Sequence, residues 1–365
     1  MALRRGHAIT AVLGVSAVLA ILDLLWAATL HYKVAQPDFY VYYLAAQLGR
    51  AHGWGAIYDP SVFLPPVTAA VGKPLPYLNP PELAWVVTPL SFLPYSVAAS
   101  IWTGLLAGAF ALIFTIVAPG RGPVRLIHGV AASTLLPVFV GVLFGQVCLL
   151  VVAGVALSWW LLSRGRPWLA GLALSLLILK PQIAFLVPPA LLLAGYWRVA
   201  VAWLTISVPL GIVTLLATGT AVFHHMSQSL NLVSGVPGPI QSSLLRLLPI
   251  PVAIIAIAAV LGVSILALWR ARGGDPSLPI AIGLISSVLV TPYVNFYDLS
   301  ALVLAAWLIL RTHPSRWQRA VTFGIYVPLY AAPIVPLVTL ACLCGWLVSL
   351  AVPSRGGPSR IEEAA

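Results

Sequence analysis

The chain has 365 residues, of which 61% are hydrophobic and only 7% are charged. This composition excludes a soluble protein, because soluble domains carry about 25% charged residues. The mean hydropathy of +1.03 instead indicates a chain that crosses a membrane several times. The formal net charge of +11 is the one feature that suggests nucleic acid, so the positions of the basic residues have to be examined.

Apolar segments recur along the whole chain. A helix needs about 20 apolar residues to cross the hydrocarbon layer, so the sequence predicts an all-α, polytopic transmembrane bundle with about 10–12 membrane segments. Two segments, 168–179 and 183–196, are too short for complete crossings. The predicted segments are 7–30, 97–118, 126–143, 147–162, 168–179, 183–196, 199–217, 251–269, 277–291, 298–310, 318–332 and 334–351.

The first segment, 7–30, is predicted to be a retained helix. Its apolar run is about twice as long as a signal-peptide core, and no convincing small-residue cleavage site follows it. Asp23 interrupts the run, and a carboxylate at bilayer depth is costly. We therefore expect Asp23 to have a structural partner on another helix.

The arginines indicate how the chain is oriented. They occupy every second loop and the termini, which is the pattern of cytoplasmic loops, provided that 168–179 and 183–196 count as two passes. The sequence thus predicts a bacterial cytoplasmic-membrane protein with a cytoplasmic N-terminus, one membrane domain over 1–352 and a short cytoplasmic tail over 353–365. The basic excess is then a topology signal, with some attraction to anionic lipid, and we expect no nucleic-acid partner. The arginines concerned are Arg4, Arg5, Arg121, Arg125, Arg164, Arg166, Arg198, Arg270, Arg272, Arg311, Arg316, Arg319, Arg355 and Arg360.

The remaining loops, which include 31–96 and 218–250, are predicted to face the outside of the membrane. Four of the eight carboxylates and all three lysines of the chain fall in them, so we expect the chemistry on this face. Within 31–96, the stretch "FYVYYLAAQLGRAHG" has helical apolar spacing and ends at Gly53, which predicts an interfacial amphipathic helix. "GWGAIYDP" predicts a turn with Asp59 as a turn residue, and "YLNPPELAWVVTPLSFLP" a proline-broken return into the membrane.

Asp38 precedes the predicted interfacial helix, and two roles suit it. Asp is favoured as a helix N-cap. A carboxylate at the membrane surface also suits a general base, and one carboxylate cannot easily serve in both roles.

Lys180 lies between the two half-length segments, in "LALSLLILKPQIAFLV". A cation at bilayer depth costs roughly 2.5–3.5 kcal/mol and usually marks a pathway or a paired ligand. The alternatives are snorkelling to the interface and an anion site, most simply for a lipid phosphate. Arg246, in "SSLLRLLPIP", is either a second phosphate partner or a helix-end anchor.

The cysteines and two neighbouring histidines give weaker evidence for a functional site. The three cysteines, Cys148, Cys342 and Cys344, are expected to be small buried hydrophobes. His224 and His225 have no third ligand at metal spacing and are expected to be loop residues. The sequence contains no nucleotide-binding loop and no paired Asp-x-Asp motif, so we expect neither a cofactor nor a metal.

Several motifs together resemble glycosyltransferase family 87, whose members are integral membrane enzymes of the GT-C type. They are "PDFYVYYLAA", "AIYDP", "YLNPPELAWVVTPLSFLP", "GQVCLLVVAGVALSWWLLSRGRPWLAGLALSLLILKPQ" and "TPYVNFYD". Each motif is weak by itself, but they follow one another in colinear order over roughly residues 10–310.

The resemblance implies an inverting transfer of a sugar, typically mannose, from a polyprenyl-phosphate donor to a lipid-linked or envelope-glycan acceptor on the outer face. It implies that the acid of the first outer loop, here Asp38, is the general base, and that Lys180 faces the donor phosphate. Arg246 is a second phosphate candidate. Further candidates for binding the substrates are Tyr42, Tyr77, Asn79, Glu82, Gln146, Gln182, Asn295, Tyr297 and Asp298.

One motif departs from the family pattern. Many relatives carry a histidine near the end of the motif that reads "TPYVNFYD" here, where Tyr297 or Asp298 stands in its place. The identity of the sugar therefore stays open, and another polyprenyl-phosphate sugar such as arabinose is an alternative. A transporter or flippase of lipid-linked sugars is the main rival function, because broken helices and a buried lysine suit it too. A structural subunit would leave the costly charges unexplained.

Overall fold

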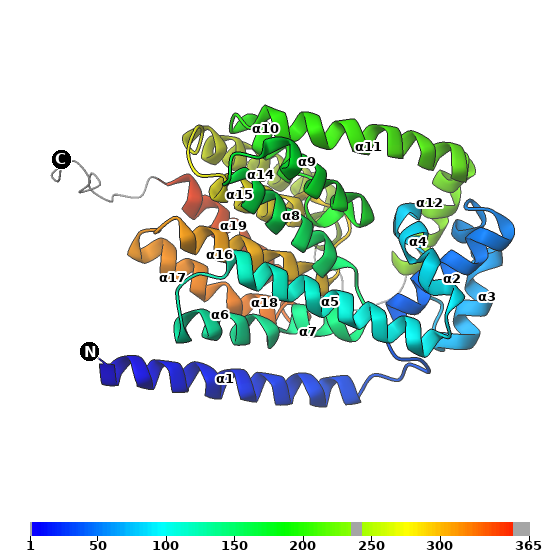
Figure 1. Ribbon diagram of the computed structural model, residues 1–365, viewed down its shortest axis with the longest axis horizontal. Helices are drawn as coiled ribbons and strands as arrows, with labels where there is room; N and C mark the ends of the chain where they lie inside the picture. The colour runs from blue at the N-terminus through cyan, green and yellow to red at the C-terminus, as the bar shows by residue number, and fades with distance from the viewer. Residues whose placement is uncertain (1, 235–242, 353–365) are drawn as a thin grey trace.

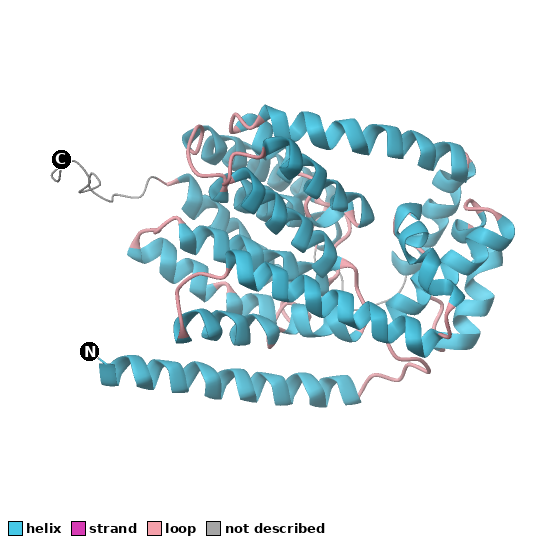
Figure 2. Cartoon of the chain, in the orientation of Figure 1, coloured by secondary structure: helices cyan, strands magenta, loops and turns pink. Residues whose placement is uncertain are grey.

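The computed structural model describes residues 2–234 and 243–352, and every regular element within them is a helix. Figure 1 shows a bundle with a smaller group of helices at one end, and Figure 2 shows helices and loops in the described part. The predicted all-α membrane bundle is confirmed. The predicted tail over 353–365 lies outside the described residues.

Four of the described helices are long and apolar enough to cross a membrane, and a fifth span results if one pair of helices, bent by 62°, is counted as a unit. Most of their side chains face away from the protein, as expected of helices in contact with lipid. The four are α1 (Ala2–Ala28), α5 (Tyr95–Val117), α11 (Trp197–Thr218) and α14 (Ile250–Arg270), and the bent pair is α6 (Pro123–Ser133) with α7 (Leu136–Leu143).

The other predicted membrane segments form shorter helices. Proline explains several of the breaks, because it lacks a backbone N–H and clashes with the preceding turn. The half-length pair breaks at Lys180–Pro181, as its sequence predicts. The short elements are α8 (Cys148–Leu162), α9 (Pro167–Leu174), η3 (Ser175–Leu179), η4 (Pro181–Ile183), α10 (Val187–Leu193), α15 (Ser277–Val290), η5 (Phe296–Ser300), α16 (Ala301–Arg311), α17 (Arg316–Gly324), α18 (Tyr326–Tyr330) and α19 (Pro336–Ala351).

The core of the bundle is formed by α8, α15 and α16. These helices are apolar around their whole circumference, which is typical of helices surrounded by other helices. α15 packs against α16, α10 and α14, and α8 packs against α5 and α9. Side chains at the N-terminal end of α8 and in η5 are thereby held inside the protein, away from lipid.

A separate group of helices, here called the outer cap, follows α1. The predicted helix at the start of the loop is present as α2, which ends at His52 and is followed by Gly53 with a positive φ of 90°. It packs against α3, which the sequence analysis did not anticipate, and against α4 and η2, which form the proline-broken stretch. The outer cap consists of α2 (Pro37–His52), η1 (Ala56–Tyr58), α3 (Pro60–Val71), α4 (Pro81–Val87) and η2 (Thr88–Phe92), and α12 (Ala221–Ser234) packs on α3 and η1.

The expected partner of Asp23 is present. α1 lies along the side of the bundle against α6 and α7 (Figure 1). Asp23 is 1% exposed, and its Oδ1 accepts a hydrogen bond of 2.8 Å from the hydroxyl of Tyr330 on α18. This bond joins the peripheral first helix to the bundle.

Three local expectations need correction or refinement. Cys342 is exposed and Cys344 half-exposed, so only Cys148 is buried. Cys342 and Cys344 differ from Cys148 because α19 lies at the edge of the bundle, where an apolar side chain can face lipid.

His224 and His225 lie in α12 and not in a loop, because the stretch 221–234 supplies an amphipathic face that packs on the outer cap. Asp59 is the N-cap of α3, where its side chain accepts the Ser61 N–H.

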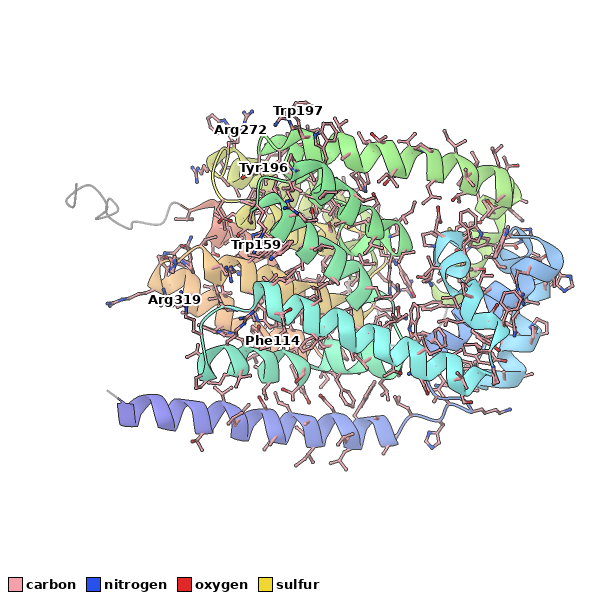
Figure 3. All side chains as sticks on the ribbon, viewed as in Figure 1. Phe114, Trp159, Tyr196, Trp197, Arg272 and Arg319 are labelled. Atoms are coloured by element: carbon pink, nitrogen blue, oxygen red, sulfur yellow. The ribbon has the colours of Figure 1, made fainter. Side chains whose placement is uncertain are left out.

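The arginine-bearing loops gather at the end of the bundle opposite the outer cap. Tyr196 donates to the Gly274 carbonyl and Arg311 to the Val117 carbonyl, so two pairs of chain segments are joined there. Figure 3 shows Arg272, Arg319 and Trp197 at this end, here called the basic end. α1 runs from the basic end toward the outer cap.

Gly145 joins α7 to α8 with a φ of +72°, a conformation that costs other residues energy. A Cβ at this position would lie 2.6 Å from the Cβ of Phe39 on α2. We expect Gly145→Ala to lower the free energy of unfolding by about 1–3 kcal/mol, measured as reduced thermal stability of the purified protein. Gly141→Ala is the matched control, because a Cβ there meets nothing within 4 Å. Equal stability of the two variants would contradict this packing argument.

Candidate functional site

The N-terminus of α2 is tied to the segment between α7 and α8. Gln36 is the N-cap residue, and Asp38 lies in the first turn without capping the helix. The backbone N–H groups of Asp38 and Phe39 both donate to the Phe144 carbonyl at 3.1 Å. The capping interpretation of Asp38 is therefore wrong, because a carbonyl from another element already satisfies the N–H groups at this helix end.

The Asp38 side chain is partly exposed and points to Gln146. Its Oδ2 accepts a hydrogen bond from Gln146 Nε2. Burial raises the pKa of Asp38 to about 6, although the Gln146 bond and the charge of Lys180 oppose the rise. Within the described residues, no hydrogen bond to Oδ1 accompanies the one to Oδ2, which leaves Oδ1 free to take a proton.

Gln146 links Asp38 to the interior. Its Oε1 accepts from the Tyr42 hydroxyl at 2.9 Å and from Lys180 Nζ at 2.8 Å. Because an ammonium can only donate, Oε1 must face Lys180, and this fixes Nε2 toward Asp38. Both acceptor positions of the amide are then occupied by the protein.

Lys180 lies at the break between η3 and η4, and its side chain is 4% exposed. Its Nζ forms an ion pair with Asp298 Oδ1 at 2.6 Å and donates to Gln146 and to Cys148 Sγ, the latter at 3.5 Å. An ammonium has three N–H donors, so all of them have protein partners. Snorkelling does not describe this lysine, because it is buried and paired.

Asp298 is completely buried, and its carboxylate is fully used. Besides Lys180, its Oδ1 accepts from Cys148 Sγ at 3.1 Å, and its Oδ2 accepts the Asn295 N–H at 3.0 Å in a capping box of η5. These contacts favour a role in holding Lys180 over a role in binding substrate. Sequence analysis missed the contribution of Cys148, although its position two residues after Gln146 at the start of α8 is a signal that was available.

Aromatic and amide groups surround this ion pair. The Asn295 Nδ2 donates to the hydroxyls of Tyr297 and Tyr293, the latter at 3.1 Å. Lys180 Nζ lies 4.8 Å from the centre of the Tyr297 ring, a favourable cation–π distance. Tyr293 is another residue that the sequence analysis did not single out. Tyr42, Gln146, Lys180, Asn295, Tyr297 and Asp298, all predicted site residues, thus join Asp38 in one network.

Three other candidates form a second cluster in the outer cap. The Tyr77 hydroxyl donates to the Pro80 carbonyl, and the Asn79 carbonyl accepts from Tyr58 at 2.7 Å. Glu82 is 4% exposed, accepts from Thr214 of α11 and has no partner in the described structure for its Oε2. Burial raises the pKa of Glu82. Among the described residues, no hydrogen bond joins this cluster to the Asp38 network.

The last two candidates lie at the periphery. Gln182 is half-buried in η4. Arg246 is exposed in the last turn of α13 (Leu244–Leu247), whose preceding residue Ser243 donates to the Pro292 carbonyl at 2.8 Å. This contact places α13 beside the "TPYVNFYD" motif that supplies Asp298.

An open hollow of about 350 Å³ begins two residues before Asp38. Gln36 adopts a left-handed backbone (φ 53°), and its side-chain Oε1 is buried without a partner in the described part of the chain. Tyr95, Ser96, Ser100 and Thr103 of α5 add hydroxyl groups to the lining. The exposed lining is nevertheless mostly apolar, and the hydroxyls of Tyr95, Ser100 and Thr103 each donate to a backbone carbonyl.

A family model described as glycosyltransferase family 87 matches residues 77–292, which is more than half of the chain. The chain belongs to glycosyltransferase family 87. The match includes Gln146 and Lys180 and ends at Pro292, a few residues before Asp298, the ion-pair partner of Lys180. Searches of curated proteins and of solved structures returned no match.

Membership of glycosyltransferase family 87 makes the chain a membrane glycosyltransferase. Such an enzyme uses a sugar donor and an acceptor in the membrane. No group of three or more His, Cys, Asp or Glu residues that could hold a metal ion occurs in the described residues.

The ion pair yields a stability prediction. Removing one partner of a buried pair leaves an uncompensated charge and typically costs about 3–5 kcal/mol. We therefore expect Lys180→Met and Asp298→Leu each to lower the thermal stability of the purified protein strongly. The double variant Lys180→Met/Asp298→Leu removes both charges, so it should recover much of the loss. Additive losses in the double variant would contradict the pairing.

Proposed function

We propose that this membrane glycosyltransferase transfers a sugar, typically mannose, from a polyprenyl-phosphate donor to a lipid-linked or envelope-glycan acceptor, with inversion. The observation that carries the proposal is the Asp38 carboxylate, which is held on one side by Gln146 and is partly exposed on the other. A carboxylate in this position suits a general base, because one oxygen is oriented and the other can accept a proton.

The proposed reaction is a single displacement. The acceptor hydroxyl oxygen forms a bond to the anomeric carbon while the bond from that carbon to the phosphate oxygen breaks. The hydroxyl proton moves to Asp38 Oδ1, and the electron pair leaves with the polyprenyl phosphate. The hollow beside Gln36, two residues from Asp38, is the proposed entry for a substrate.

We propose that Lys180 and Arg246 supply the positive charge for the departing phosphate. All three N–H groups of Lys180 have partners within the protein. Lys180 therefore acts through its electrostatic field and through Gln146, unless the sugar donor displaces one of these partners. A charge in this buried position acts strongly, because little water screens it. Arg246 lies on α13 next to the motif that holds Lys180, and its exposed side chain is accessible to a lipid phosphate.

The second cluster is proposed to bind substrate as well. Tyr77, Asn79 and Glu82 come from the motif "YLNPPELAWVVTPLSFLP" in the outer cap. Glu82 Oε2 has no hydrogen-bond partner in the described structure, so it is the atom best placed to accept from a substrate. Gln182, on η4 just after Lys180, is proposed to reach a sugar hydroxyl from the other side of the network.

The direct test supplies purified protein with radiolabelled polyprenyl-phosphate sugars and a membrane lipid extract. A labelled glycolipid formed from one of these donors is the expected result. Mannose and arabinose donors assayed in parallel identify the sugar. Label transfer from a nucleotide sugar alone, with none from any polyprenyl-phosphate donor, would contradict the proposed donor class.

Substitution of Asp38 tests the base. Asp38→Asn keeps the size and hydrogen-bonding ability of the side chain but cannot accept the proton, and a general base typically contributes about 10²–10⁴-fold to the rate. We expect turnover to fall by this factor in Asp38→Asn and in Asp38→Ala, while donor binding and melting temperature of the Asn variant stay near those of the wild type. An active Asp38→Asn enzyme would exclude Asp38 as the base.

The pH dependence of the wild-type rate is a second test of Asp38 as the general base. A base works only when it is deprotonated, and the pKa of Asp38 lies at about 6. We expect kcat/KM to fall tenfold per pH unit below about pH 6 and to be level above it. A profile that is flat down to pH 4.5 would show that a different group takes the proton.

We propose that the outer cap faces the periplasm or cell exterior of a bacterial inner membrane and that the N-terminus is cytoplasmic. Position 51 lies at the end of α2 and position 163 at the basic end, and both are exposed. In a background without Cys342 and Cys344, Ala51→Cys should react with an impermeant thiol reagent in cells with an opened outer membrane, whereas Ser163→Cys should not. The reverse labelling would invert the topology.

A further inference from the structure

A cavity of about 380 Å³ opens at the basic end of the bundle, between α14, α15, α16, α17 and α19. It lies about 30 Å from the Asp38 network, because α14 is 21 residues long and rises about 1.5 Å per residue from α13, beside the network, to Arg270 at the cavity. The cavity is therefore separate from the candidate active site.

The lining of the cavity divides into an apolar floor and a polar rim. Leu278, Ile309 and Leu350 contribute apolar surface from three helices, while Arg270 and His313 supply basic groups. This division matches an amphipathic ligand that carries a charged head on an apolar body.

Arg270 is the basic group that the structure orients best. It ends α14, and its Nη1 donates to the Ala351 carbonyl at the end of α19. A guanidinium carries five N–H donors in a planar fork that matches a phosphate, so one such bond holds the group in place and leaves others for a ligand. The exposed side chain keeps these donors accessible.

The charge around the cavity is strongly positive. Arg311, Arg316 and Arg319 flank it on α16 and α17, and Arg272 follows α14. Among the carboxylates that the structure describes, only Asp275 lies at this end, and its Oδ1 accepts the Ser277 N–H. The electrostatic field therefore favours an anion.

Exposed tryptophans place this cavity at a membrane–water boundary. Tryptophan is enriched at the headgroup level of membranes, because its ring is amphipathic. Trp197 opens α11, Trp269 closes α14 next to Arg270, and Trp317 opens α17, and each is exposed by 44% or more. A phosphate at the rim would thus have its acyl chains beside the apolar floor and the hydrocarbon layer.

We propose that this cavity binds the phosphate headgroup of an anionic membrane lipid, with Arg270 as the principal phosphate ligand. Basic pockets between membrane helices are suited to such headgroups. The proposal is independent of the proposed transferase mechanism, because neither Asp38 nor Lys180 takes part in it.

The test measures retained lipid by native mass spectrometry on the purified full chain, titrated with phosphatidylglycerol or with phosphatidylcholine. The wild type should retain phosphatidylglycerol preferentially. Arg270→Gln should weaken that retention by about tenfold, the value of one charge-assisted contact, and Arg272→Gln is the matched control that should behave as the wild type. Equal losses in the two variants would reduce the effect to general surface charge and overturn the proposal.

A second variant separates the cavity from the charge and from folding. Ala271→Leu adds volume to the lining and leaves every charge in place, so it should also lower phosphatidylglycerol retention. Unchanged retention in Ala271→Leu overturns the proposal even if Arg270→Gln does not fold. Full displacement of the lipid by millimolar inorganic phosphate would also overturn it, because the site would then recognise a free anion.

Discussion

The buried ion pair between Lys180 and Asp298 is the constraint on which the candidate site depends. An ammonium in a water-poor interior must have a negative partner and a full set of acceptors, because desolvating it is costly. Asp298, Gln146 and Cys148 supply these acceptors. Because Gln146 Oε1 must accept from Lys180, the orientation of the Gln146 amide is fixed. Its Nε2 then donates to Asp38 and orients that carboxylate. The position of the proposed base is thus a consequence of how one buried cation is neutralised.

The turn from Phe144 to Gln146 connects this constraint to the fold. The Phe144 carbonyl receives two N–H groups from α2, Gly145 lets the backbone of this turn approach Phe39, and the Gly145 carbonyl accepts from Trp102 of α5 at 2.7 Å. The outer cap and the bundle therefore meet at three consecutive residues. Such a rigid junction is suited to holding a partly exposed carboxylate against a buried network.

The two ends of the molecule differ in charge and in chemistry. The outer-cap end holds the networked carboxylates, the hollow beside Gln36 and the residues proposed to act on a sugar. The opposite end holds the arginines and exposed tryptophans, whose arrangement suits lipid phosphates and a membrane boundary. This separation gives a physical meaning to a net charge of +11, which by itself says nothing about where the charge acts.

The sequence by itself determined the all-helical membrane class, the helix after the first span, the break at Lys180 and most members of the site. These features are local, because hydropathy, proline and the cost of a buried charge act within a short stretch of chain. The motif order also pointed to the family. Only the tertiary structure decided which polar groups meet: Tyr42 and Gln146 are 104 positions apart, and Cys148 and Asp298 are 150 positions apart. It likewise decided that Cys342 faces outward, that Asp38 caps no helix and that the donors of Lys180 are engaged within the protein. Pairing across such separations depends on how the helices pack, and no spacing along the chain encodes it.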